Sequence, residues 1–154
     1  SMTATAMYAS LQKRLDGIWP ASSPTKAVVA LLHLENKTTE HIDTDVIADK
    51  IQIEVIKAGS LRFVDRSRIK DISKEFDLGG SGLIDAATAK RAGSVLVADF
   101  LLTGEMSGIS KSSGTKQLRY YRLSMRLLQV STDEIVWADD FEIKKGVSKN
   151  ILDW

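Results

Sequence analysis

The first twenty residues carry apolar side chains at helical spacing. Four of them recur every three or four positions: Tyr8, Leu11, Leu15 and Ile18. This spacing predicts an amphipathic helix over residues 3–18, which Pro20 ends. An isolated helix of this length cannot keep such a stripe in water. Because the linker at residues 20–26 is short, we expect the helix to pack on its own domain, with packing against a second copy of the chain as the alternative.

A short apolar run follows, and after it comes a second helical pattern. Residues 27–32 are almost continuously apolar, which predicts a strand buried on both faces. After a polar loop, Asp43 or Thr44 can accept backbone N–H bonds as the N-cap of a helix, and Gly59 ends that helix as its C′ residue. The apolar positions of the helix recur on one face: Ile47, Ile51, Val55 and Ala58.

The next segment predicts one more strand and two more helices. Residues 61–64 form the strand, and Asp65 is suited to cap the helix that follows it. Asp85 has the same role for a fourth helix that runs to about Val95. The glycine-rich residues 79–82 connect the two helices. The inward positions of the third helix are Ile69, Ile72 and Phe76.

Three long strands are predicted for the C-terminal half. Residues 98–109, 117–130 and those from 134 onward alternate apolar and polar side chains, and a period of two is typical of strands. Placing the apolar side chains of the last two strands on one face requires odd residues to lie opposite odd residues. We therefore expect a hairpin loop of three residues around Thr132 and Asp133.

The same register places basic side chains of one strand opposite acidic side chains of the next. Arg122 and Arg126 then lie within reach of Asp140 and Glu142 as cross-strand pairs. Arginines interleaved with aromatic rings, as in residues 119–122, can also bind single-stranded nucleic acid. Because the acidic strand would neutralise these arginines, we favour the cross-strand pairs and expect no nucleic-acid partner; a protein-binding patch is the remaining alternative.

The order of the predicted elements defines the fold class. After the first helix the order is β-α-β-α-α-β-β-β, which favours an α/β sandwich: a mixed twisted sheet of about five strands with helices packed on its faces. The chain has 154 residues, which suffices for one domain with a substantial core.

Composition excludes several classes of function. Twenty-one Lys and Arg stand against twenty Asp and Glu, and this balance does not fit a dedicated nucleic-acid binder. The chain has no cysteine and two histidines, so disulfides, thiolate metal ligands and thiol nucleophiles are excluded. No apolar run reaches the ~18 to 20 residues that cross a bilayer, and no secretory leader pattern opens the sequence.

No cluster of residues predicts a catalytic or cofactor site. The glycines of residues 79–82 lack the Lys-Ser/Thr that completes a P-loop. Asp139 and Asp140 are neighbours on a strand and point to opposite faces, so they cannot converge on one substrate. His33 and His41 lack the spacing of metal ligands, and no GxSxG elbow is present. We expect no enzyme activity, no metal and no cofactor.

Five sequence blocks recur together in one family of bacterial envelope proteins. They are Asn-Lys-Thr-Thr-Glu-His-Ile-Asp-Thr at 36–44, Phe-Val-Asp-Arg-Ser at 63–67, Ser-Gly-Leu-Ile-Asp at 81–85 with Ala-Thr-Ala at 87–89, Ala-Asp-Phe-Leu-Leu-Thr-Gly at 98–104, and Glu-Ile-Val-Trp-Ala-Asp at 134–139. In this order and spacing the chain resembles the globular domain of the LpoB family, outer-membrane lipoproteins that activate a bifunctional penicillin-binding protein.

The resemblance implies a fold and a location. It implies a sandwich like the TolB amino-terminal and CsgG-like domains, over residues 27–145, preceded by the helix and linker at 1–26 and followed by a tail at 146–154. The family carries a lipobox cysteine and a flexible tether ahead of this domain. The opening Ser1-Met2 favours a start that is not native, so we expect a periplasmic protein held at the outer membrane by a lipid anchor outside this fragment.

The resemblance also implies a function. The expected function is a non-enzymatic activator that binds the regulatory domain of a class A penicillin-binding protein and stimulates peptidoglycan synthesis, as a monomer. The alternatives are a CsgG-like oligomeric structural or secretion component and an envelope domain that binds a small molecule. We expect the partner on the fourth helix, the loop before it and the neighbouring helix: Arg68, Ser81, Gly82, Lys90 and Arg91.

The sequence departs from the family pattern at two positions near this surface. The proline that usually follows the aspartate at the start of the fourth helix is Ala86 here, so the first turn loses a residue that presets its geometry. The glycine that usually precedes Ala-Asp is Val97, which replaces a C′ glycine. Both changes lie next to the expected partner surface, so they bear on the partner more than on the fold.

Overall fold

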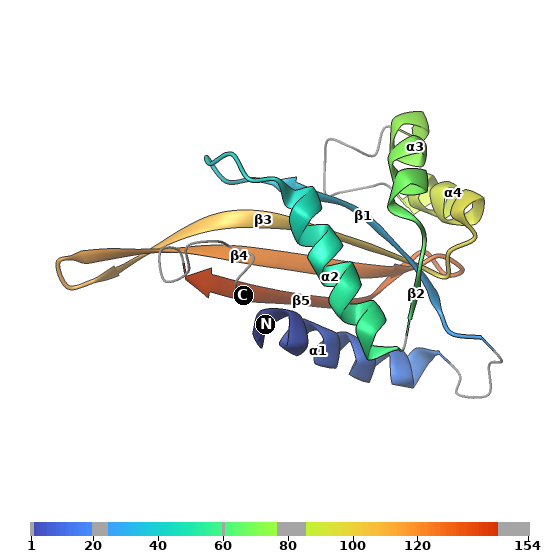
Figure 1. The fold of residues 1–154 in the computed structure, drawn as a ribbon, viewed down its shortest axis with the longest axis horizontal. Coiled ribbons are helices and arrows are strands. Elements are labelled where there is room, and N and C mark those ends of the chain that lie inside the picture. The colour runs from blue at the N-terminus through green and yellow to red at the C-terminus, as the bar shows by residue number, and fades with distance from the viewer. Residues whose placement is uncertain (1, 20–24, 60, 77–85, 145–154) are drawn as a thin grey trace.

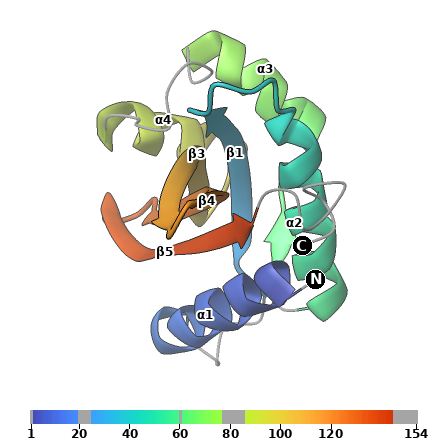
Figure 2. The ribbon, with the colours of Figure 1, turned by 90° about the vertical axis from the view of Figure 1, so that its left-hand side faces the viewer.

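A five-stranded mixed sheet with helices on both faces forms the fold (Figures 1 and 2). The computed structural model describes residues 2–19, 25–59, 61–76 and 86–144. The helices are α1 Met2–Ile18, α2 Thr44–Ala58, α3 Arg66–Phe76 and α4 Ala86–Leu96; the strands are β1 Val28–Asn36, β2 Arg62–Phe63, β3 Phe100–Ser113, β4 Lys116–Gln129 and β5 Glu134–Lys144. The predicted fold class and order of elements are confirmed.

The strands lie in the order β2-β1-β3-β4-β5. β1 runs parallel to both β2 and β3, while β3, β4 and β5 form two antiparallel hairpins. The parallel neighbours need crossover connections: α2 links β1 to β2, and α3 and α4 lie between β2 and β3. The β2-β1-β3 part of the sheet is therefore parallel and connected through helices, and the β3-β4-β5 part is an antiparallel meander.

Each face of the sheet packs on its own pair of helices. The larger core lies against α1 and α2 and includes Val29, Leu31, Phe100 and Leu102, all fully buried. The smaller core lies against α3 and α4 and includes Ile69, Ile72 and Ala92 from the helices. β1 supplies Ala30 and Leu32 to this second core. The prediction that residues 27–32 are buried on both faces is confirmed.

A bulge in β1 shapes the larger core. Leu31 lies opposite Leu102, but Leu34 lies opposite Gly104, so β1 uses one residue more than β3 over the same length. The extra residue lets Leu31 and Leu34 both enter the same core. A Cβ on Gly104 would lie 2.5 Å from Met125 Sδ and 2.6 Å from the Ser124 carbonyl oxygen, so only glycine fits at this position.

The predicted helix ends agree with the structure where it describes them. Asp43 accepts a hydrogen bond from the backbone N–H of Asp45 (3.1 Å), and Gly59 ends α2 at φ +83°. Asp65 accepts from the backbone N–H of Ser67 (2.8 Å) at the start of α3. The predicted cap Asp85 and the glycine-rich connection lie outside the described residues, as does the side chain of Phe76.

The β4–β5 loop corrects one prediction. Gln129 lies opposite Glu134, so the loop holds four residues, 130–133, where we expected three. A bulge then shifts the register, because Leu128 lies opposite Ile135 and Leu127 lies opposite Trp137. An even loop with a one-residue bulge gives the same parity as an odd loop, so the odd-to-odd register is correct beyond it.

The first helix packs on its own domain, as expected. Met7, Leu11 and Leu15 are buried in the larger core. Trp137 Nε1 donates to Ser10 Oγ (2.9 Å), and Arg14 Nε donates to the Val136 carbonyl oxygen (2.6 Å), so hydrogen bonds also join α1 to β5. The buried stripe begins at Met7, whereas Tyr8 is half-buried at its side.

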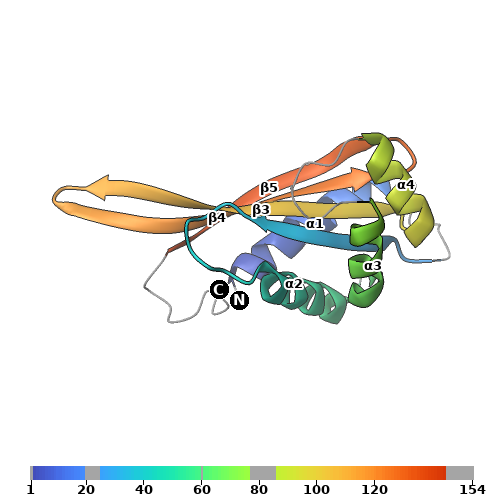
Figure 3. The same cartoon turned by 90° about the horizontal axis from the view of Figure 1, so that it is seen from above.

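The β3–β4 hairpin extends beyond the rest of the sheet (Figure 3). β1 ends at Asn36, opposite Met106, while β3 continues to Ser113. The sequence pattern predicted β3 only as far as Ile109. We call residues 107–121 the arm; it lies at one end of the long axis, and α3 and α4 lie at the other (Figure 1).

Leu11→Ala should lower the free energy of unfolding by about 2–5 kcal/mol, because it opens a cavity between α1 and the sheet. Lys13→Ala, on the exposed side of the same helix, is the control and should change it by less than about 0.5 kcal/mol. Urea unfolding followed by circular dichroism measures both. Equal effects of the two substitutions would contradict the packing of α1 on its own sheet.

Candidate functional site

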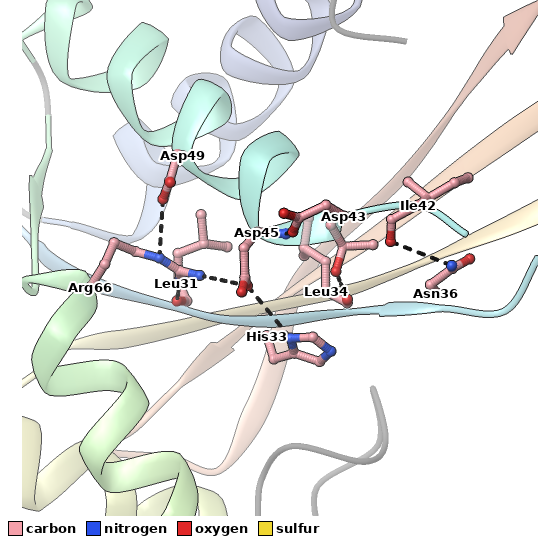
Figure 4. Close-up of polar contacts among 10 residues, drawn as sticks. Leu31, His33, Leu34, Asn36, Ile42, Asp43, Asp45, Asp49 and Arg66 are labelled. Carbon is pink, nitrogen blue, oxygen red and sulfur yellow. Dashed lines mark hydrogen bonds and ion pairs between the residues drawn. The ribbon is translucent and has the colours of Figure 1, made fainter. Parts of the chain in front are cut away.

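The outer edge of β1 is largely open, because β2 pairs with it only at Val28 and Val29. Arg66, the first residue of α3, covers the next part of this edge (Figure 4). One guanidinium nitrogen donates to the Leu31 carbonyl oxygen, Nη2 lies 3.4 Å from Asp45 Oδ1, and Nε lies 3.4 Å from Asp49 Oδ1. A single half-buried arginine therefore joins α3, β1 and α2.

Side chains of the first recurring block cover the rest of the edge. Thr44 is buried, and its hydroxyl donates to the Leu34 carbonyl oxygen (2.5 Å). Asn36 Nδ2 donates to the Glu40 carbonyl oxygen (2.9 Å), and its Oδ1 accepts from the Thr38 backbone N–H (3.0 Å) and hydroxyl (2.6 Å). Asn36 thus holds the loop between β1 and α2 in a fixed shape.

Two charged groups near these elements have shifted pKa values. The pKa of Asp65 is lowered from its ordinary value, first because the Ser67 hydroxyl donates to its carboxylate. The pKa of Lys37 is raised, first because its ammonium hydrogen-bonds Glu105, 3.0 Å away. Both shifts favour the charged forms, so the Asp65 carboxylate and the Lys37 ammonium are charged at neutral pH.

A polar pocket of about 300 Å³ lies between this loop and the base of the arm. The Tyr121 hydroxyl donates to the Glu40 carboxylate across it. On the arm side it is lined by Gly108, Ser110 and Arg119, among others. The sequence singled out residues 119–122 as a candidate surface but did not predict this pocket. The loop and the arm are far apart in the sequence, and only the pairing of β1 with β3 and of β3 with β4 brings them together.

The expected partner surface lies at the other end of the molecule. Lys90 and Arg91 are exposed on α4. Arg68 is exposed on α3, and its guanidinium donates to the Val95 carbonyl oxygen (2.7 Å), which ties the two helices together. The structure therefore brings Arg68 to α4. Ser81 and Gly82 lie outside the described residues.

Val97 is an unusual residue next to this surface. It has φ +55°, in the left-handed region, which a β-branched residue rarely adopts. The N–H of Ala98 donates to the Gly93 carbonyl oxygen (3.0 Å), as expected for a helix end with its C′ residue at position 97. The side chain is 75% exposed and Val95 beside it is 45% exposed. Two apolar side chains thus lie in water near the basic residues of α3 and α4.

The remaining candidates have local structural roles. Arg122 lies 3.6 Å from Asp140 and 3.3 Å from Glu142, which confirms the predicted cross-strand pairs for this residue; Arg126 lies opposite Ala138. His33 is an edge residue whose Nδ1 lies 3.7 Å from Asp45. Across the described ranges no group of three or more potential ligands could hold a metal ion. None of the helices in those ranges has the length and apolar character that a membrane crossing needs.

The fold defines a class of small α/β domain, with a five-stranded mixed sheet between two pairs of helices. The chain belongs to the LpoB family of peptidoglycan-synthase activators, because the model of that family matches residues 1–143. The match includes α1, which lies ahead of the five recurring blocks. Comparison with curated proteins gives no significant match.

Solved structures share this fold at low sequence identity. The LpoB C-terminal domain from Salmonella enterica superposes with a TM-score of 0.63 at 17% identity, over 90% of this chain and 96% of that one. The corresponding Escherichia coli domain gives 0.58 at 16%, over 88% and 96%. Lipoprotein GNA1162 from Neisseria meningitidis gives 0.58 at 10%, over 81% and 88%. At these identities the similarity defines the fold alone.

Arg66→Ala should lower the free energy of unfolding by about 1–3 kcal/mol, because the buried Leu31 carbonyl loses its side-chain donor. Lys70→Ala, an exposed position of the same helix, is the control and should have little effect. Denaturant unfolding measures both. If Arg66→Ala unfolds at the wild-type midpoint, the β1 edge does not depend on this arginine.

Val97→Gly should raise the free energy of unfolding by up to about 1 kcal/mol. The left-handed conformation costs about 1–2 kcal/mol for a residue with a Cβ, and the greater freedom of glycine in the unfolded chain offsets part of the gain. Val95→Gly, within the last turn of α4, should instead lower it, by at most about 1 kcal/mol. Thermal unfolding of both variants measures the difference in sign, and a loss of stability in Val97→Gly would show that position 97 is not strained.

Proposed function

We propose that this protein is a non-enzymatic activator that binds a class A penicillin-binding protein and stimulates peptidoglycan synthesis. The observation that carries the proposal is the match of nearly the whole chain, residues 1–143, to the synthase-activator family. The same match does not favour the CsgG-like alternative. We place the site of contact on the regulatory domain of the synthase and the protein in the periplasm, held at the outer membrane by a lipid anchor.

An activator without chemistry of its own works through binding energy. It must bind the active conformation of the synthase more tightly than the inactive one, and the difference in affinity sets how far the equilibrium moves. A tenfold preference corresponds to about 1.4 kcal/mol. A rigid surface serves this purpose, because little of its binding energy is lost in ordering side chains. We propose that a monomer suffices for this.

The surface that we propose for the synthase lies on α3 and α4. Its exposed basic residues include Lys90, Arg91 and Arg68, and by their sequence position we add Ser81 and Gly82. The exposed Val97, which follows the end of α4, adds an apolar side chain to this surface. Protein interfaces usually combine apolar side chains with a polar and charged rim. The conformational cost of Val97 supports this role, because strain in a folded protein is often retained at functional positions.

The proposal is tested by isothermal titration of the full chain into the cognate class A synthase, solubilised in detergent, with glycan polymerisation as a second readout. We expect binding together with a higher polymerisation rate. Failure of the chain both to bind and to stimulate would refute the proposed function. Binding without stimulation would refute the activator role alone.

Combined charge reversal, Lys90→Glu with Arg91→Glu, should weaken binding to the synthase by at least ~1 kcal/mol with a nearly unchanged melting temperature, because rim charges affect association more than folding. Lys13→Glu, an exposed position on α1, is the control for a general charge effect. Val97→Gly should also weaken binding, although it stabilises the fold. Wild-type affinity in the charge-reversed variant would remove α4 from the proposed interface.

A further inference from the structure

The inner edge of the arm lacks a neighbouring strand. The last backbone contact between β1 and β3 is the hydrogen bond from the Lys37 N–H to the Met106 carbonyl oxygen (2.8 Å). After Lys37 the chain turns away into the loop that leads to α2. Among the described residues, no strand pairs with β3 on this side from position 107 to its end. Within the described ranges, the pairing groups of β3 in the arm therefore have no strand partner on this side.

The strand register identifies which groups these are. Ser113 lies opposite Lys116 around a two-residue turn, and Gly114 in this turn has φ +63°. Peptide groups of successive residues point to opposite sides of a strand. Because Met106 bonds toward β1, the N–H and C=O groups of Gly108, Ser110 and Ser112 point the same way. They form a short row of donors and acceptors with no strand partner in the part of the chain that the structure describes.

The polar pocket lies beside this row. Gly108 is part of its lining, and a Cβ built on Gly108 would meet no atom within 4 Å. Packing therefore does not require a glycine here, in contrast to Gly104. A glycine in a strand often marks a place where another backbone approaches closely. The hydrogen bonds of Asn36 and the contact between Tyr121 and Glu40 hold the opposite wall in place.

The charge of the arm selects the partner. Residues 107–121 contain Lys111, Lys116 and Arg119 and no Asp or Glu. Arg119 is exposed and lines the pocket, and it makes no ion pair within the described ranges. Lys37, the other cation of the pocket, already pairs with Glu105, and the Glu40 carboxylate in its lining accepts from the Tyr121 hydroxyl. The positive arm thus favours an acidic chain.

We propose that the β3 edge of the arm binds an extended acidic segment of the synthase by strand addition. The segment pairs with the backbone of Gly108, Ser110 and Ser112 and places a carboxylate in the pocket beside Arg119. Main-chain hydrogen bonds supply affinity in this mode of recognition, and side-chain pockets supply specificity. A third strand also supports the arm, since a two-stranded ribbon alone is marginally stable.

This proposal rests on the proposed function, because it assigns the segment to the synthase. It adds a second contact at the end of the molecule opposite α3 and α4 (Figures 1 and 3). The two contacts are separable by mutation, so each can be removed while the other remains.

The test uses the full chain and the full-length cognate synthase in detergent. Ser110→Pro removes the outward N–H of residue 110, and the inward ladder to β4 remains, because proline is tolerated at a strand edge. Ser110→Ala keeps the N–H and is its matched control. Arg119→Glu reverses the charge at the pocket, with Lys13→Glu as control. We expect at least tenfold weaker binding for Ser110→Pro and for Arg119→Glu, and wild-type binding for both controls.

Hydrogen exchange gives a second readout that does not depend on any substitution. In wild-type protein, the synthase should slow exchange of the amides of Gly108, Ser110 and Ser112. If the wild type binds but these amides exchange unchanged, or a folded Ser110→Pro variant binds normally, strand addition is refuted and the proposed function stands. Slow exchange without synthase, with dimers in light scattering, would assign the edge to a second copy and also refute it. Absence of any binding by the wild type refutes both proposals.

Discussion

The open edge of β1 is the constraint on which the rest of the structure depends. A two-residue β2 leaves most of that edge without a neighbouring strand, yet buried carbonyl groups must find donors. Arg66 donates to Leu31 and Thr44 donates to Leu34. Because these donors belong to α3 and α2, satisfying the strand edge also fixes both helices against the sheet. Further out, Asn36 fixes the loop that forms one wall of the pocket.

This constraint explains why the family blocks lie where they do. The block at 36–44 covers the β1 edge, and the block at 63–67 supplies the cap Asp65 and the edge donor Arg66. In the block at 98–104, Asp99 accepts from the Val28 N–H (2.8 Å) and Gly104 leaves room opposite the β1 bulge. These blocks preserve the scaffold.

The sequence predicted the elements that follow from local periodicity and helix capping. It did not predict features that depend on how several strands and loops fit together. Helix α2 and its caps follow from Asp43, Gly59 and a regular apolar stripe, and the left-handed position 97 follows from the glycine of the family pattern. The four-residue length of the β4–β5 loop was not predicted, because a one-residue bulge beside the loop restores the odd-to-odd pairing that we expected from a three-residue loop. The outer part of the arm was missed because residues 110–117 are polar and carry no alternation. Placing Arg119 beside the loop at residues 37–40 requires the sheet register, which no local pattern contains.

The two ends of the molecule carry features that the scaffold does not need. At one end Val97 holds an exposed apolar side chain in a strained conformation, and at the other no strand among the described residues pairs with the inner edge of β3 beyond Met106. Each lowers stability or invites aggregation unless a partner uses it. Both lie outside the contacts that Arg66 and Thr44 make along the β1 edge, and independent sites contribute nearly additively to stability. Substitutions at either end should therefore leave the core intact, so each of the two proposed contacts can be changed while the fold is retained.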